Sequence, residues 1–348
     1  MTSQKILKTW NDFFSEKGLE KKIKDSYISY IKKLLDNNVP IIFEFNHLAL
    51  LLGRQKKYLA SVVNSPSAHY RSFYIPKRKG GEREITAPYP ALLEMQYWIF
   101  HNILKQISVD SSAHGFVYKK SILTNARIHA GEKELLKIDL LNFFPSINLN
   151  RIIYVFKSLG YPNEICYYLA AICSYNGYLP QGAPTSPYLS NIIAKQLDKR
   201  LINFSKKYDL KYSRYADDLT FSGKSIPSIM IEYIAKIIQD EGFEMNLGKT
   251  RLYKTAGKRI VTGISVLKKE IKLPRNYKRD LKQDLFFIFK YGLPSHIAKK
   301  KIRKANYLLS LIGKVSFWLS IEPDDLFAIK AKEELLKIHN SLEIDKSE

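Results

Sequence analysis

The sequence predicts an α+β fold in which helical regions at both ends flank a middle section of short strands. Residues 1–70 and 274–348 carry apolar residues at helical spacing among many charges. Between them, short runs rich in aromatic and β-branched residues are separated by turn formers such as Gly80 and Gly81. With 348 residues and 45% hydrophobic content, we expect a sizeable core divided into two or three subdomains.

The first half of the chain supports this prediction element by element. Residues 74–85 predict a basic hairpin around the Gly-Gly turn, and residues 90–107 return to helical periodicity. An apolar strand is expected over residues 134–144, interrupted by a single acid, Asp139. Helices are then expected at about 149–159 and 163–174.

The second half repeats the alternation of helices and hairpins. Ser186-Pro187 is expected to open a long helix that reaches Lys207, because serine caps helices and proline suits the first turn. The later elements are expected in this order: a hairpin over 211–222, a helix over 227–241 that Gly242 ends, a hairpin over 258–273, and basic, amphipathic helices.

The tip of the hairpin over 211–222 is the most informative feature, because Asp217 and Asp218 place two carboxylates in one small volume. Adjacent carboxylates repel one another, and a divalent cation that prefers hard oxygen ligands, such as Mg²⁺, makes the arrangement tolerable. A solvated Asp-Asp turn is the alternative interpretation.

Asp139 is the candidate for a third metal ligand. An acid within an apolar strand needs a partner or a metal, although a buried structural aspartate fits the same pattern. If this strand lies beside the hairpin, Asp139, Asp217 and Asp218 converge. Two Mg²⁺ ions held there would activate a 3′-hydroxyl and neutralise charge on a triphosphate and on the leaving pyrophosphate.

The charge balance indicates the kind of partner. The formal net charge is +23, from 56 Lys and Arg against 33 Asp and Glu, which suits a polyanion. Cys166 and Cys173 are expected to be small core residues and not a zinc site or a disulfide, as in a reducing compartment. Because no signal sequence or apolar run of about 18 residues is found, we expect a cytoplasmic protein without membrane contact.

Several motifs, taken in order, resemble those of reverse transcriptases over about residues 70–320. They are Asp139…Phe144, Leu179-Pro180-Gln181-Gly182, Tyr215-Ala216-Asp217-Asp218, Gly242…Lys249 and Val261-Thr262-Gly263. The Leu179 loop also leads into an expected helix N-terminus, which favours contact with phosphate or template. Asn125-Ala126-Arg127-Ile128-His129 resembles the Asn-Ala-x-x-His motif of bacterial retron enzymes, and Val261-Thr262-Gly263 resembles their Val-Thr-Gly triplet.

The resemblance implies a right-hand polymerase with fingers, a ferredoxin-like palm and a helical thumb. The expected domains are an N-terminal helical region over 1–70, fingers over 71–133, a palm over 134–257 that includes fingers-derived helices at about 149–178, a primer-grip-like hairpin over 258–273, and a thumb with the C-terminus over 274–348.

The resemblance to retron enzymes also implies substrates and partners. A structured noncoding RNA would serve as template and primer, and a guanosine 2′-hydroxyl of that RNA would start DNA synthesis from dNTPs. The product would be msDNA, a branched RNA-linked single-stranded DNA. Such enzymes act in antiphage defence with a separately encoded effector protein, and the resemblance implies the same here.

Site residues follow from the matching positions. Phe144 would close the sugar pocket against a ribose hydroxyl, or else pack in the core with Phe143. Gln181 would contact the nucleotide or template. Lys77 and Arg83 could grip the triphosphate. Lys249 could act as general acid toward pyrophosphate, or be a plain surface lysine.

RNA recognition is expected outside the aspartate site. The predicted RNA-binding residues are Asn125, His129, Val261, Thr262, Gly263, Lys300, Lys301 and Arg303. His129 is expected to be structural or to contact RNA and not to bind a metal, because no second ligand stands at a suitable spacing. The cations at 299–304 are expected to form either a solvated helix face or a phosphate contact.

Other functions remain open at this point. A different bacterial reverse transcriptase, of the diversity-generating or abortive-infection type, would carry the same aspartates. A non-catalytic RNA-binding scaffold would have no need for three mutually repelling acids. A metal-dependent nuclease would not need the nucleotide-pocket residues.

Overall fold

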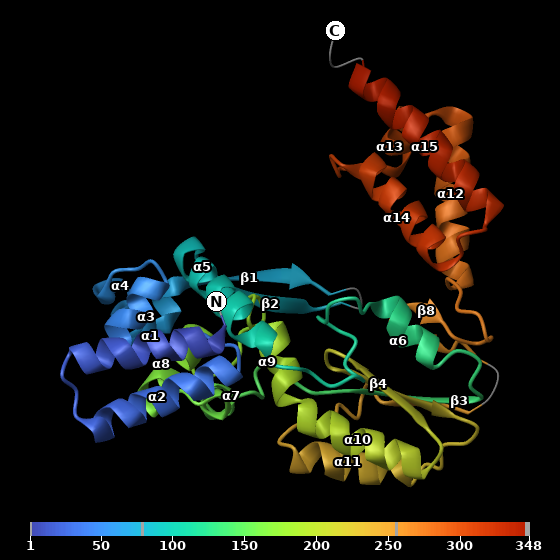
Figure 1. Ribbon diagram of the computed structural model, residues 1–348. Helices are drawn as coiled ribbons and strands as arrows, with labels where there is room; N and C mark the ends of the chain where they lie inside the picture. The colour runs from blue at the N-terminus through green and yellow to red at the C-terminus, as the bar shows by residue number, and fades with distance from the viewer. Residues whose placement is uncertain (1, 78–79, 255–256, 345–348) are drawn as a thin grey trace. The chain divides into compact units, whose positions relative to one another are not determined.

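The computed structural model describes residues 2–77, 80–254 and 257–344 and has the mixed helix and sheet architecture expected (Figure 1). Contacts divide the chain into two compact units. Unit 1 comprises Met1–Lys119, Lys137–Leu219 and Pro227–Arg251, and unit 2 comprises Lys120–Leu136, Thr220–Ile226 and Leu252–Glu348.

Unit 1 begins with the expected helical region. Its elements are α1 (Ser3–Glu16), α2 (Lys21–Asp36), α3 (Phe45–Leu51), α4 (Lys56–Asn64) and the 3₁₀ helix η1 (Pro66–His69). Helices α1 and α2 pack through aromatic side chains, with Phe14 stacked on Tyr27 at a centroid distance of 5.4 Å. Ile31 and Leu34 are fully buried on α2, so these amphipathic helices present their apolar faces to the core.

The expected basic hairpin is formed by β1 (Tyr70–Pro76) and β2 (Glu82–Pro88). The strands are antiparallel, with Pro76 opposite Glu82. Gly80 and Gly81 have positive φ angles of 88° and 78°, which glycine adopts without steric cost. Arg78 and Lys79 of the connecting loop lie outside the described residues. Helix α5 (Pro90–Asn102) and the 3₁₀ helix η2 (Leu104–Gln106) follow.

Strand β3 (Glu134–Asp139) is shorter than predicted. The strand was expected to reach Phe144, but it ends at Asp139, and Asn142 adopts a left-handed φ of 46° within the following turns. Asparagine tolerates a left-handed conformation better than most residues, so the chain can turn at Asn142. The strand therefore ends although the apolar residues continue to Phe144. The expected helices are confirmed as α7 (Leu149–Leu159) and α8 (Asn163–Ile172). Cys166 and Cys173 are buried free thiols.

The predicted long helix after the Pro-Gly loop is interrupted. It consists of α9 (Ser186–Ile193) and α10 (Lys195–Lys207), with a break at Ala194, where ψ is 0°. The prediction that Ser186 caps this helix is also wrong. Thr185 occupies the cap position with helical φ and ψ angles and accepts no side-chain capping bond, so Ser186 lies inside the helix.

The central four-stranded sheet has the order β4-β5-β3-β6, with β4 (Lys211–Tyr215), β5 (Asp218–Gly223) and β6 (Arg251–Tyr253). Helices α7 to α10 connect β3 to β4, and α11 (Met230–Asp240) connects β5 to β6. This βαββαβ connectivity with its strand order is ferredoxin-like. Helix α10 packs on β4 and on α11 (Figure 1). Asp217 and Asp218 lie where β4 turns into β5.

Unit 2 contains α6 (Ile122–Ile128), the short antiparallel strands β7 (Ile260–Val261) and β8 (Ile264–Ser265), and four C-terminal helices. These helices are α12 (Arg275–Tyr291), α13 (Leu293–Lys300), α14 (Tyr307–Ile321) and α15 (Leu326–Ile344). They share one apolar core with the hairpin, in which Trp318, Leu285 and Val261 are fully buried. A hairpin was predicted over 258–273; its paired strands lie within residues 260–265, and Ser265 forms a further bridge with Lys272. The C-terminal helices were also predicted.

Candidate active site

A cavity of about 730 Å³ lies within unit 1 beside the acid turn. Its walls come from the β1–β2 hairpin, the turns after β3, the loop before α9 and the β4–β5 turn. The residues predicted for a nucleotide site that line it are Lys77, Arg83, Asp139, Phe144, Gln181, Asp217 and Lys249. Asp218 follows directly as the first residue of β5. Seven predicted site residues from distant segments therefore meet at one cavity.

The two carboxylates of the turn resist ionisation. Burial is the main cause that raises the pKa of Asp217 to about 6, and the charges of Asp218 and Asp139 contribute to the same rise. The pKa of Asp218 is also raised, mainly by burial, while Lys137 opposes the shift. Ionising these buried and mutually close carboxyl groups is therefore costly, and a bound cation would reduce that cost.

Asp139 already has a cationic partner. The Lys249 Nζ atom donates to both carboxylate oxygens of Asp139, at 2.9 Å each. Asn246 donates to the same carboxylate at 3.2 Å, and its backbone N–H donates to the Asp139 carbonyl at 2.8 Å. The Lys249 side chain is 63% exposed and that of Asp139 14% exposed, so this ion pair opens to solvent on the lysine side. The sequence did not single out Asn246 as a site residue.

The donor chemistry of the three aspartates fits a divalent cation, since carboxylate oxygens are its preferred ligands. Across residues 2–77, 80–254 and 257–344, no three His, Cys, Asp or Glu side chains are arranged as a ready ligand set. The Lys249 ammonium pairs with the Asp139 carboxylate and supplies the positive charge that a metal ion would otherwise supply. An ion shared by all three aspartates would therefore have to displace Lys249.

Two adjacent phenylalanines have different surroundings. Phe143 is 3% exposed and packs on Phe243 at a centroid distance of 5.5 Å. Phe144 is half-buried and lines the cavity, with Phe116 at 6.5 Å. Phe143 is therefore the core residue, and Phe144 is the aromatic available to a ligand. Phe116, which has a left-handed φ of 62°, was not anticipated from the sequence.

The loop that carries Gln181 is fixed to the hairpin. The Gln181 carbonyl accepts a hydrogen bond from the Thr86 backbone N–H at 2.9 Å. Gly182 has a φ of 142°, and a Cβ there would lie 2.7 Å from the Thr86 carbonyl oxygen, so only glycine permits this approach. On the same hairpin, the Lys77 backbone N–H donates to the Gly81 carbonyl at 2.9 Å.

The predicted RNA-binding residues all belong to unit 2, and several are buried there. Asn125 and His129 are fully buried, and His129 Nδ1 lies 2.7 Å from the Ser222 hydroxyl. Val261 is buried in the core, while the Thr262 hydroxyl donates to the Ile122 carbonyl at 3.1 Å. These contacts give the motif residues a structural role in unit 2. Their predicted contact with RNA stays a prediction.

The cations at 299–304 do not form a single helix face, contrary to that expectation. Helix α13 ends at Lys300, and Lys301 turns the chain with a left-handed φ of 52°, so Arg303 and Lys304 follow the helix. Lys300 forms an ion pair with Asp284 of α12.

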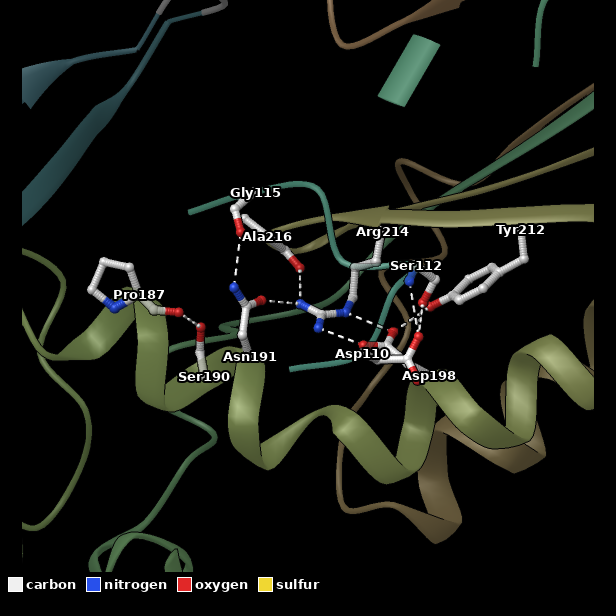
Figure 2. Close-up of polar contacts among 10 residues, drawn as sticks. All are labelled: Asp110, Ser112, Gly115, Pro187, Ser190, Asn191, Asp198, Tyr212, Arg214 and Ala216. Carbon is white, nitrogen blue, oxygen red and sulfur yellow. Dashed lines mark hydrogen bonds and ion pairs between the residues drawn. The ribbon is translucent and has the colours of Figure 1, made fainter. Parts of the chain in front are cut away.

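A buried polar network behind the acid turn was missed entirely by the sequence analysis (Figure 2). Its centre is the ion pair between Arg214 of β4 and Asp198 of α10, at 2.6 Å. Burial opposes the guanidinium charge, but Asp198 outweighs it and the pKa of Arg214 is raised. Two sequence features could have revealed this network: Asp198 lies beside Leu197 on the apolar face of α10, and Arg214 lies within a strand.

The chain is similar to several known proteins. A family model described as reverse transcriptase, or RNA-dependent DNA polymerase, matches residues 75–277. Retron Ec86 reverse transcriptase of Escherichia coli is 33% identical over 295 residues, covering 83% of this chain and 88% of that protein. Retron Mx65 reverse transcriptase of Myxococcus xanthus is 37% identical over 239 residues, covering 63% and 56%. A structure of a foamy viral protease-reverse transcriptase with double-stranded DNA covers 89% of this chain and 52% of that one, at 15% identity and a TM-score of 0.40.

The chain therefore belongs to the reverse transcriptase family, the RNA-directed DNA polymerases, and within it to the retron reverse transcriptases of bacteria. The predicted family, enzyme class and polymerase fold class are confirmed. In the part of the chain that the structure describes, no helix combines the length and apolar character needed to span a bilayer.

Proposed function

We propose that the unit 1 cavity is a nucleotidyl-transfer site that adds dNTPs to a primer on an RNA template. The observation that carries this proposal is the convergence of Asp139 and Asp217 with Lys77 and Arg83 at one cavity. Acids at one position suit metal ions, and cations at another suit the triphosphate of the incoming nucleotide. A nuclease would not need cations such as Lys77 and Arg83 for an incoming triphosphate.

The metal set that fits best is two Mg²⁺ ions held by Asp139, Asp217 and Asp218. Such ions would lower the pKa of the primer 3′-hydroxyl and neutralise charge on the triphosphate. Lys249, which pairs with Asp139 and lines the cavity, would donate a proton to the leaving pyrophosphate once released from that pair. Gln181 would contact the nucleotide or template from the loop fixed on Thr86.

The metal assignment is tested with Asp217→Asn and Asp218→Asn. Each variant loses one ligand charge, so primer extension in Mg²⁺ should fall by about a hundredfold to a thousandfold. RNA binding should stay close to wild type because the basic surface is intact. Asp209→Asn is the matched control, since Asp209 is exposed with a left-handed φ of 52° that asparagine accepts. Extension at the wild-type rate by either test variant would exclude this metal site.

We also propose that Phe144 selects the sugar. A planar ring beside C2′ leaves no room for a ribose hydroxyl, so Phe144→Ala should raise ribonucleotide incorporation relative to deoxynucleotide incorporation. The control is Phe143→Leu, which should lower thermal stability without changing sugar choice because Phe143 packs in the core. Equal selectivity in Phe144→Ala and wild type, measured by single-nucleotide incorporation, would place the gate elsewhere.

For the cellular role, we propose msDNA synthesis from a cognate noncoding RNA in the cytoplasm, with a separate effector protein and a part in antiphage defence. Membership in the retron enzymes supports this proposal. Unit 2 is the proposed recognition part, through the Val261–Gly263 turn and the basic residues Lys300, Lys301 and Arg303. We propose fingers, palm and thumb boundaries as predicted from the sequence.

A further inference from the structure

A polar network in the interior of unit 1 connects helix α10 to the acid turn (Figure 2). Arg214 and Asp198 at its centre are both fully buried. The Arg214 Nε and Nη2 atoms donate to the two carboxylate oxygens of Asp198, at 2.8 and 2.6 Å. The Tyr212 hydroxyl donates to the same carboxylate at 2.8 Å. Two of the three guanidinium nitrogens are therefore bound to Asp198.

The third nitrogen of Arg214 serves the turn itself. Its Nη1 atom donates to the Ala216 carbonyl oxygen at 3.1 Å and to Asn191 Oδ1 at 3.0 Å. Asn191 Nδ2 in turn donates to the Gly115 carbonyl at 2.8 Å (Figure 2). A Cβ on Gly115 would lie 2.7 Å from the Ala216 nitrogen, so this segment packs directly on the backbone of the turn.

Ala216 needs such support because its φ is 56°, a left-handed conformation that alanine disfavours. Both carbonyl groups that flank the Asp217 Cα atom accept hydrogen bonds from outside the turn. Arg214 binds the Ala216 oxygen, and the Leu140 backbone N–H donates to the Asp217 oxygen at 2.9 Å. Leu140 follows Asp139, so the same contacts set the position of Asp217 relative to Asp139.

We propose that Arg214, oriented by Asp198 and Asn191, is a positioning residue that holds the Ala216–Asp217 turn and thereby the metal-binding carboxylates. This inference rests on the metal site proposed above. Arginine is required because its planar fork can serve Asp198, Asn191 and Ala216 at once, whereas a lysine ammonium is a single point of charge. If the Arg214–Asp198 ion pair served only to stabilise the fold, the hydrogen bond from Arg214 to the Ala216 carbonyl would not be needed.

The test compares Arg214→Lys with Tyr212→Phe. Lysine retains the charge against Asp198 but cannot bind all three partners, so the turn should loosen. We expect the primer-extension rate at saturating Mg²⁺ to fall by about tenfold to a hundredfold, with the KM for dNTP changed by less than about threefold. Tyr212→Phe removes a hydrogen bond to Asp198 and leaves the Arg214 contact to Ala216, so its rate should stay near that of wild type.

A second readout does not depend on activity. Mn²⁺ binding to the protein without RNA, followed by electron paramagnetic resonance, should weaken in Arg214→Lys and stay unchanged in Tyr212→Phe. Asn191→Ser is the second variant, because it keeps the ion pair and removes the Asn191 bonds to Arg214 and Gly115. It should weaken Mn²⁺ binding even if Arg214→Lys does not fold.

The outcomes separate the two proposals. If Asp217→Asn loses Mn²⁺ binding while Asn191→Ser and any folded Arg214→Lys bind Mn²⁺ like wild type, the network is purely structural and the positioning role is wrong. If Asp217→Asn itself binds Mn²⁺ like wild type, the metal site is wrong and the positioning role is overturned with it.

Discussion

Two ion pairs of unit 1 differ in their surroundings. Arg214 and Asp198 are 2.6 Å apart with both side chains fully buried. Lys249 and Asp139 are 2.9 Å apart, with the lysine side chain 63% exposed and the aspartate 14% exposed. The buried pair has further bonds to Tyr212, Asn191 and Ala216.

Burial determines which of the two pairs can change partners. A charge left alone in the interior is costly, so Arg214 and Asp198 must stay together as long as the protein is folded. An exposed pair gains little, because water screens it and can replace either partner. We therefore expect Asp139 to exchange Lys249 for a metal ion, and we expect the buried pair to stay together and hold the Ala216–Asp217 backbone, as proposed above.

The largest expected effect comes from breaking the buried pair. Asp198→Asn leaves the Arg214 charge uncompensated and should lower the free energy of unfolding by about 3–5 kcal/mol. Urea denaturation monitored by circular dichroism measures it. Arg200→Met is the control on the same helix, since Arg200 pairs with Asp240 and Glu241 near the surface and should cost less than about 1 kcal/mol. Similar losses in both variants would remove the distinction between buried and exposed pairs.

A smaller effect is expected at the acid turn and has the opposite sign. The pKa of Asp217 is about 6 in the folded protein against an ordinary 3.8, so the folded state binds the proton more tightly. Stability is therefore lost as the pH rises from about 4 to 6 and stays lower above that range. Asp217→Asn should be more stable than wild type at pH 7.5 by about 1–2 kcal/mol, and equally stable below pH 4.

Urea denaturation of both proteins in EDTA across pH 4–7.5 measures this difference, with Asp209→Asn as the control. Added Mg²⁺ should stabilise the wild type and reduce this difference in stability, because a bound metal ion neutralises the carboxylate charge as the proton does at low pH. If the difference in the free energy of unfolding between the two proteins does not change with pH, ionisation of Asp217 does not destabilise the folded state.

The smallest effect on stability is expected at the exposed pair. Lys249→Met should change the free energy of unfolding by less than about 1 kcal/mol. By removing a competitor for Asp139, it should lower the Mg²⁺ concentration for half-maximal primer extension by up to about fivefold, the ratio that corresponds to 1 kcal/mol. Lys249→Arg, which retains the charge, is the control. A raised Mg²⁺ requirement in Lys249→Met would mean that Lys249 assists the metal and does not compete with it.

Local sequence signals predicted most elements correctly and failed where the backbone left a regular pattern. The basic hairpin, helices α7 and α8 and the C-terminal helices were predicted from periodicity and turn residues. The strand expected to reach Phe144 ended at Asp139, and the helix expected to reach Lys207 broke at Ala194. Apolar spacing says which residues are buried, but not where a left-handed residue such as Asn142 turns the chain.

Residue type and order were enough to predict the α+β class, the retron motifs and seven of the residues that line the cavity. The pairing of Lys249 with Asp139 across 110 positions and of Arg214 with Asp198 in the interior became known only from the folded chain. Both pairings join charged groups from different elements. The cost of burying a charge is set by what surrounds it after folding, and neighbours in the sequence do not supply that information.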